Sequence, residues 1–288
     1  RLADYFAPRY ARRKPRCMTV IVQLSDPHFG TERPEVLTAL QDWLTVEPPD
    51  VLVLSGDITQ RARRREFDAA RAFLASLPPH TLVATPGNHD IPLHNLLARF
   101  LAPFAEFSRA FDTLHTPRFY NGSVAITTLN TATPWLHRHG RIRPHALEAE
   151  LAWLAQLPAH ATRVLVAHHP FAVHRLHDYP SQLPDAPAAL SRLAAAGVDV
   201  VLGGHVHYPF MRCVTQPAET GHALWVMQAG TALSSRVRAG MPNSVNRLLC
   251  HPTDKRQAKL EQWDFIGGRF VCVQKTWLGR EGGLVVAG

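Results

Sequence analysis

The sequence predicts an α/β fold, a two-sheet β-sandwich flanked by helices, and two features of the pattern indicate it. Over residues 19–85, apolar runs of strand length alternate with segments of helical spacing, which is typical of a parallel sheet covered by helices. After residue 210 the helical spacing ends. The short runs that follow suggest a second, largely antiparallel sheet packed on the first. No linker or repeat is evident, so a single domain over residues 18–288 is the simplest organisation.

The expected strands are short apolar runs bounded by turn residues or polar residues. They lie at residues 19–25, 51–54, 81–85, 119–120, 124–129, 164–167, 198–202, 210–214, 223–228, 245–251, 259–265 and 270–277. Asn121-Gly122 separates two of these runs and predicts a hairpin turn, because both residues tolerate the left-handed backbone that such a turn needs.

The expected helices are marked by apolar residues that recur at intervals of three and four. They lie at residues 34–46, 63–77, 93–111, 144–157 and 186–196. Pro48-Pro49 stops the first, and Pro144 stands at the first turn of the fourth. Gly197 offers a C-terminal cap to the last.

The segment 93–111 has the strongest helical pattern, and its apolar face is wide. Pro103 lies inside it and is expected to kink the helix. Packing of this face on the sheet is the simpler interpretation. The alternative is a cap, or a membrane-touching surface, for a lipid-like substrate.

Composition excludes several classes of protein. The 288 residues carry a formal net charge of +8, and residues 1–17 hold six basic side chains against Asp4 alone. We expect this stretch to be a disordered or non-native tail, with Met18 as the natural start. The remainder is close to neutral, so nucleic-acid binding is not expected. No apolar run approaches the roughly 20 residues of a membrane span.

The four cysteines are scattered, and no pair has the CxxC spacing of a metal or redox site. This usage predicts reduced thiols in a cytoplasmic protein. The sequence leaves the oligomeric state open.

Five polar islands interrupt the apolar runs, each at the end of an expected strand. They are Asp26-Pro27-His28, Gly56-Asp57, Asn88-His89-Asp90, His168-His169-Pro170 and Gly204-His205-Val206-His207. Ligands collect beyond the carboxyl ends of strands in α/β sheets, so these loops are expected to meet. Asp26 and His28 are two residues apart, and in an extended chain they would point the same way. Mixed Asp, Asn and His ligands suit two divalent or trivalent transition-metal ions, such as Mn, Fe, Zn or Co, better than calcium.

The order of these motifs (DxH, GD, GNHD, HHP and GHxH) resembles that of the calcineurin-like metallophosphoesterases. The resemblance spans residues 19–210. It implies a two-sheet sandwich flanked by helices and a hydrolase in which a metal-bound hydroxide attacks a phosphoester. The first and third motifs, in a compact chain, are also similar to those of the bacterial class III cyclic-nucleotide phosphodiesterases.

The resemblance also implies a role for each motif residue. The implied ligand sets are Asp26, His28 and His207 for one metal ion, and Asn88, His168 and His205 for the other. Asp57 would bridge both ions, and His169 would stand behind the ligands. His89 would stabilise or protonate the leaving oxygen while Asp90 orients its imidazole. Asn88 and His89 are also expected to contact the substrate.

The substrate is expected to be a small-molecule phosphodiester, such as a cyclic nucleotide. An alternative is the pyrophosphate of UDP-2,3-diacylglucosamine, a lipid A precursor, which would bring the chain to the inner-membrane surface. The main branch of those lipid enzymes usually carries Arg where His89 stands, but the 93–111 face keeps this alternative open. A non-catalytic metal-binding scaffold is a second alternative, and the presence of His89 disfavours it.

Two further segments are candidates for substrate contacts. Arg236 or Arg238 could bind a phosphate through two hydrogen bonds, or both could simply face solvent. The loop from Trp135 to Arg141 could stack on a base or sugar, or be an ordinary surface loop.

Overall fold

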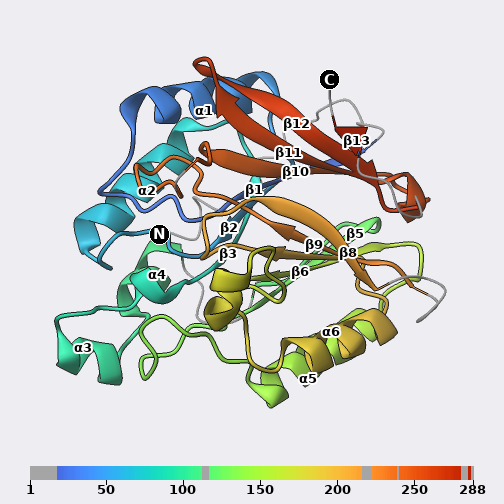
Figure 1. The fold of residues 1–288 in the computed structure, drawn as a ribbon, viewed down its shortest axis with the longest axis horizontal. Coiled ribbons are helices and arrows are strands. Elements are labelled where there is room, and N and C mark those ends of the chain that lie inside the picture. The colour runs from blue at the N-terminus through green and yellow to red at the C-terminus, as the bar shows by residue number, and fades with distance from the viewer. Residues whose placement is uncertain (1–17, 112–116, 216–221, 239, 280–284, 287–288) are drawn as a thin grey trace.

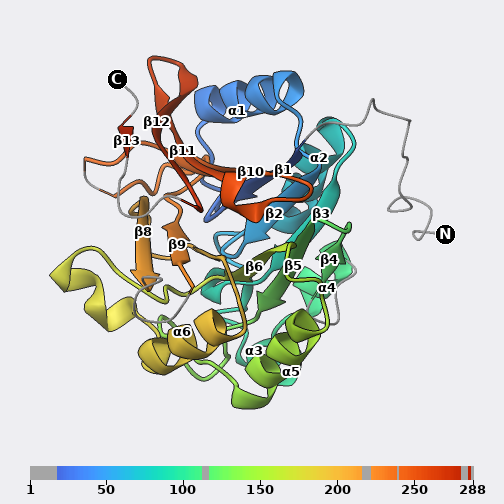
Figure 2. The same cartoon turned by 90° about the vertical axis from the view of Figure 1, so that its right-hand side faces the viewer.

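Two mixed β-sheets face each other, and helices cover their outer faces (Figures 1 and 2). The computed structural model describes residues 18–111, 117–215, 222–238, 240–279 and 285–286. The expected N-terminal tail, residues 1–17, lies outside the described residues. Every helix among the described residues is too short or too polar to span a lipid bilayer.

The first sheet has seven strands in the order β13-β12-β11-β10-β1-β2-β3. Their bounds are β1 Thr19–Leu24, β2 Val51–Ser55, β3 Thr81–Thr85, β10 Ser244–Cys250, β11 Lys259–Ile266, β12 Arg269–Trp277 and β13 Val285–Val286. Strands β1, β2 and β3 are parallel, as the alternating pattern predicts. Strand β10 joins β1 in antiparallel register, with Ile21 opposite Leu248.

The second sheet has six strands in the order β4-β5-β6-β7-β9-β8. Their bounds are β4 Phe119–Tyr120, β5 Val124–Leu129, β6 Thr162–Ala167, β7 Val200–Gly203, β8 Phe210–Thr215 and β9 Leu224–Gln228. The predicted hairpin at Asn121-Gly122 is confirmed, because β4 and β5 pair in antiparallel register and Gly122 has φ +96°. Strands β5, β6, β7 and β9 are parallel.

The prediction that the strands after residue 210 form a sheet of their own is wrong. They divide between the two sheets: β8 and β9 complete the second, whereas β10 to β12 extend the first. The chain leaves the first sheet after β3 and returns to it only at β10. An apolar run indicates that a strand is buried, but it does not indicate which neighbouring strand it pairs with.

The helices cover the outer faces of the two sheets. Their bounds are α1 Pro34–Val46, α2 Arg64–Ser76, α3 Leu96–Leu101, α4 Ala105–Phe111, α5 Pro144–Ala155 and α6 Ala186–Ala195. One apolar cluster joins α1, α2 and α4 to the first sheet, and another joins α5 and α6 to the second. A third cluster, mainly Val, Ile and Leu, fills the space between the sheets. Gly197 has φ +73°, as the predicted C-terminal cap of α6 requires.

The expected helix over residues 93–111 is two separate helices. Pro103 lies in the break between α3 and α4, because it lacks an N–H and its ring clashes with the preceding turn. Helix α3 begins only after Asn95, whose side chain accepts a hydrogen bond from the backbone N–H of Ala98. Helix α4 buries Phe107 and Phe111, whereas the apolar residues of α3 are exposed. Packing on the sheet therefore holds for α4 alone.

Phe67 tests how strongly α2 and α4 depend on each other. Its ring is fully buried and meets the rings of Phe107 and Phe111 edge-on, with centroids 6.4 and 6.1 Å away. We expect Phe67→Ala to lower the free energy of unfolding by about 3–5 kcal/mol, because a large cavity remains. Val46→Ala, at a side chain that is 78% exposed, is the control and should change it little. Equal effects in chemical denaturation would contradict this packing.

Candidate metal centre

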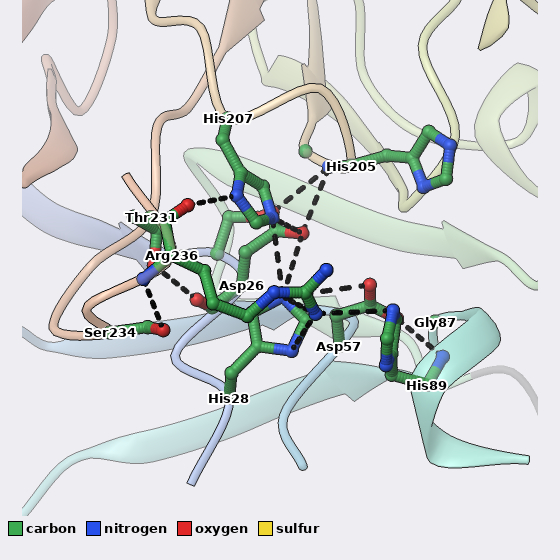
Figure 3. Close-up of polar contacts among 12 residues, drawn as sticks. Asp26, His28, Asp57, Gly87, His89, His205, His207, Thr231, Ser234 and Arg236 are labelled. Atoms are coloured by element: carbon green, nitrogen blue, oxygen red, sulfur yellow. Dashed lines mark hydrogen bonds and ion pairs between the residues drawn. The ribbon is translucent and has the colours of Figure 1, made fainter. Parts of the chain in front are cut away.

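The five polar islands meet at one edge of the sandwich, as the sequence predicts. Strands β1, β2 and β3 of the first sheet lead into Asp26-Pro27-His28, Gly56-Asp57 and the 3-10 turn Asn88–Asp90. Strands β6 and β7 of the second sheet lead into the two histidine motifs. Figure 3 shows carboxylates and imidazoles from both sheets turned toward one another. The side chains that could hold a metal ion include Asp26, His28, Asp57, His89, His168, His169, His205 and His207.

The backbone at this edge is left-handed rather than extended. Five of the gathered residues have φ between +44° and +75°, namely Asp26, His28, Asp57, His205 and His207. The prediction that Asp26 and His28 converge because the chain is extended is therefore wrong in its reason. Such a backbone costs roughly 1–3 kcal/mol at each residue that has a side chain, and it concentrates at functional sites. Here it turns the side chains of adjacent loops onto one point.

Two glycines let the loops approach each other closely. A Cβ atom on Gly87 would lie 2.2 Å from Oδ1 of Asp57, and one on Gly204 would lie 2.4 Å from Oδ2 of Asp26. Both distances are far below van der Waals contact, so any larger residue would push a carboxylate out of place. The glycines of the GNHD and GHxH motifs thus leave the space that the carboxylates of Asp57 and Asp26 occupy.

The gathered side chains form two groups that share Asp57. In the first group, Nε2 of His207 lies 3.1 Å from Oδ1 of Asp26, and Nε2 of His28 lies 3.8 Å from Oδ2 of Asp57. In the second group, Nε2 of His168 lies 3.3 Å from Oδ1 of Asp57. The two oxygens of Asp57 therefore face different groups, which is the arrangement that a bridging carboxylate needs.

Asn88 and His205 complete the second group. Nε2 of His168 lies 3.2 Å from Oδ1 of Asn88 and 3.3 Å from Nδ1 of His205. All seven residues predicted as ligands thus belong to one cluster. His169, predicted to stand behind it, accompanies His168 and His205 at distances that a shared ion allows. Nδ1 of His169 lies 2.8 Å from the Thr131 hydroxyl, while its buried Nε2 has no hydrogen-bond partner among the described residues.

The donor atoms fit metal ions better than they fit one another. Nε2 of His28 and Nε2 of His207 lie 3.2 Å apart in a buried cluster. Nδ1 of His207 donates to the carbonyl oxygen of Arg236 at 2.6 Å, so in the neutral ring Nε2 presents a lone pair. Nδ1 of His168 likewise donates to the carbonyl oxygen of Ser55 at 3.0 Å. Such bonds orient histidine ligands, and the nitrogen and oxygen donors suit transition metals.

The electrostatics of the cluster agree with metal binding. Burial would raise the pKa of the Asp26 carboxyl, but His207 outweighs burial and holds that pKa well below its usual range. Burial lowers the pKa of His205 to about 3, so this ring is neutral at pH 7. Burial opposes a proton on His168 as well, yet the charge of Asp57 raises its pKa to about 9. A metal ion that binds His168 must therefore displace a proton.

His89 stands on the open side of the cluster. Its backbone N–H donates to Oδ1 of Asp57 at 2.7 Å, which ties the loop to the shared carboxylate. Its Nδ1 donates to the carbonyl oxygen of Gln60 at 2.9 Å. The Nε2 atom faces the cluster beside Nη1 of Arg236, 3.2 Å away, and from there a protonated ring could donate to a leaving oxygen.

The predicted role of Asp90 in orienting the His89 imidazole is wrong, because Gln60 does this instead. The buried Asp90 carboxylate accepts hydrogen bonds from the backbone N–H groups of Gly87, Ile58 and Thr59 at 2.9, 3.1 and 2.9 Å. It thus fixes the loop that carries His89 against the loop after β2. Sequence reasoning missed Gln60 because it acts through a backbone carbonyl, which has no residue-type signal.

The two arginines expected to contact phosphate occupy different environments. Nη1 of Arg236 lies 3.3 Å from Nδ1 of His28 and 3.2 Å from Nε2 of His89, at the mouth of the cluster (Figure 3). Arg238 forms an ion pair with the buried Asp178 instead. Of the two candidates, Arg236 alone touches the cluster.

The family and the solved structures agree with this geometry. Residues 19–209 match the model of the calcineurin-like phosphoesterases, and the chain belongs to that family. Its clustered histidine and aspartate side chains form a site that could hold two transition-metal ions. Among solved structures it is similar to a purple acid phosphatase from yellow lupin, with TM-score 0.65, 15% identity, and coverage of 88% of this chain and 53% of that one.

A dimetal phosphatase from Danio rerio is similar over 88% of this chain and 98% of its own length, with TM-score 0.60 and 11% identity. Among curated proteins, the chain is 24% identical over 226 residues to the UDP-2,3-diacylglucosamine pyrophosphatase LpxG of Chlamydia trachomatis. LpxG of Chlamydia muridarum gives the same identity. These matches cover 66% of this chain, which spans 63% of the length of those relatives.

Asp57 and His89 allow metal binding to be separated from turnover. We expect Asp57→Asn to lower the metal content from about two ions per chain to about one or fewer, because an amide presents a single oxygen to the cations. His89→Ala should keep the metal content and lower turnover by roughly 10²–10⁴-fold. Metal analysis by mass spectrometry, beside hydrolysis of bis-p-nitrophenyl phosphate, measures both. A His89→Ala protein that has lost its metal would contradict these roles.

Proposed function

We propose that this chain hydrolyses the pyrophosphate bond of a nucleoside diphosphate linked to a lipid, as in UDP-2,3-diacylglucosamine. In this proposal Asp26, His28 and His207 hold one metal ion, Asn88, His168 and His205 hold the other, and Asp57 bridges them. The observation that carries the proposal is the guanidinium of Arg236 beside His89. The similarity to the two pyrophosphatases named LpxG supports the choice of substrate.

Arg236 favours a diphosphate because of what leaves the attacked phosphorus. Hydrolysis adds the oxygen of water to one phosphorus and breaks its bond to the bridging oxygen, which departs on the second phosphate. Nη1 of Arg236 lies 3.2 Å from Nε2 of His89, where the departing group would stand. A guanidinium binds phosphate oxygens strongly, and charge-assisted hydrogen bonds there would stabilise the developing negative charge. A cyclic nucleotide releases a sugar oxygen, which brings no second phosphate to this arginine.

The residues around the metal site would each have a separate role in the reaction. When bound, transition-metal ions would lower the pKa of a water and neutralise charge on the attacked phosphoryl group. His89, held by the carbonyl of Gln60, is placed to share a proton with the bridging oxygen as it leaves. Asn88 would contact oxygens of the attacked phosphoryl group, and Arg236 would contact oxygens of the departing phosphate. Asp90 keeps His89 in place by fixing its loop, not by touching the ring.

Hydrolysis of a cyclic nucleotide remains the second candidate. The Asp-Pro-His-Phe-Gly and Gly-Asn-His-Asp sequences resemble those of class III cyclic-nucleotide phosphodiesterases. In both reactions the attacked phosphorus carries two bridging oxygens, so the same metal cluster could catalyse either reaction. A substrate panel separates them: UDP-2,3-diacylglucosamine, cyclic AMP, cyclic GMP, a glycerophosphodiester and single-stranded DNA. The proposal requires the highest kcat/KM with the first, and a preference for a cyclic nucleotide would replace it.

Substitution of Arg236 tests whether its guanidinium, beside His89, binds the departing phosphate. We expect Arg236→Gln to lower kcat/KM for UDP-2,3-diacylglucosamine by about 10–100-fold, in proportion to the charge-assisted hydrogen bonds removed. The loss with bis-p-nitrophenyl phosphate should be much smaller, because that leaving group carries no phosphate. Arg238→Gln is the matched control, since Arg238 already pairs with Asp178. Equal losses for both substrates would contradict a role for Arg236 in binding the second phosphate.

A further inference from the structure

Helix α3 and the loop after β5 expose a continuous group of large apolar side chains. This α3 patch comprises Leu96, Leu97, Phe100, Leu101, Trp135 and Leu136. Leu101 and Trp135 are both 76% exposed, and Leu97 is 71% exposed. The rings of Phe100 and Trp135 pack on each other, with centroids 4.7 Å apart, so the helix and the loop form one surface.

The α3 patch is not an ordinary scatter of surface leucines. Isolated apolar residues are normal on a protein surface, whereas a contiguous group marks a binding surface. A helix of six residues is also too short to be stable on its own. Helix α4, which follows directly, buries its phenylalanines, so the exposure is specific to α3.

The chain around the α3 patch is strongly basic. Residues 58–65, 91–105 and 131–143 together contain eight arginines, of which six are exposed, whereas Arg99 is buried and Arg143 is half-buried. These segments meet in space. Nη1 of Arg61 lies 3.1 Å from Nε2 of His94, just before α3, and the exposed Arg138 follows Trp135 by three residues. Apolar side chains that include a tryptophan, bordered by exposed arginines, complement the interfacial region and headgroups of an anionic bilayer.

We propose that the α3 patch docks this protein on an anionic lipid bilayer. The leucines and Trp135 would enter the interfacial region, while the exposed arginines around them would face lipid phosphates. The patch is continuous with the metal centre, because the ring of His137, two residues after Trp135, lies 6.2 Å from the ring of His89. Docking would therefore bring the mouth of the cluster to the membrane surface. This inference rests on the proposed function, since a lipid-linked substrate resides in that membrane.

Vesicle binding tests the inference without any hydrolysis. The full chain would be sedimented with vesicles of phosphatidylcholine alone and with vesicles that also contain phosphatidylglycerol, neither carrying a substrate. We expect binding to the anionic vesicles, and we expect Leu97→Glu/Leu101→Glu to weaken it by about tenfold or more, because burial of two leucines is lost and two repelling charges are added. Hydrolysis of bis-p-nitrophenyl phosphate should be unchanged in that variant.

The matched control is Val46→Glu/Ile266→Glu, which adds the same charge at exposed positions on α1 and β11. These elements lie at the opposite end of the molecule from α3 (Figures 1 and 2). Any binding through residues 1–17 is common to all three proteins, so the difference between the variants isolates the patch. Three results would overturn the inference: no binding by the parent protein, equal binding by both variants, or a dimer in solution that Leu97→Glu/Leu101→Glu dissociates. Because substrate is absent, the substrate panel can fail while vesicle binding succeeds.

Discussion

The site depends on one carboxylate that must reach two groups of ligands at once. Asp57 lies in the loop after β2, the middle of three parallel strands, and its oxygens lie 3.8 Å from Nε2 of His28 and 3.3 Å from Nε2 of His168. Gly87 leaves the space for it, and the backbone N–H of His89 holds it in place. A displacement of this group would separate the two halves of the cluster, so the surrounding loops are fitted to its position.

Each half of the cluster draws residues from both sheets, and buried polar contacts join the two sheets beside it. Gln23 on β1 donates to the carbonyl oxygen of Gly203 on β7 at 2.9 Å, and His168 donates to that of Ser55 on β2 at 3.0 Å. These bonds fix the relative position of the sheets where the apolar cluster between them ends. Polar groups buried at such an edge are stabilising only when they are paired. His168 therefore belongs both to the cluster and to the contact between the two sheets.

The sequence predicts most strands and helices, and the seven residues expected as ligands do lie in one cluster. Apolar runs fix the positions of strands, and polar islands at strand ends point to one edge of the sheets. The division of the late strands between the two sheets was not predictable, because pairing partners leave no trace in local pattern. The left-handed backbone at Asp26 and His28 was missed for a related reason. An aspartate or histidine indicates which chemistry the side chain can perform, but it does not indicate the backbone conformation of the loop that carries it.

The wrong predictions for Asp90 and for α3 have a common origin. Residue type does not determine which neighbours a side chain contacts in the folded protein. A carboxylate beside a histidine suggests an orienting pair, yet three backbone N–H groups compete for Asp90 and bind it. Apolar residues at helical spacing suggest core packing, yet Pro103 separates α3 from the half that packs. The large apolar side chains of α3 are therefore exposed, although their spacing is typical of a buried helix face.

Anomalous diffraction from crystals grown with Mn²⁺ is the most direct test of the central claim. The account predicts two anomalous peaks separated by roughly 3.5–4 Å, one beside each oxygen of Asp57. A single peak, or peaks that do not adjoin Asp57, would contradict it.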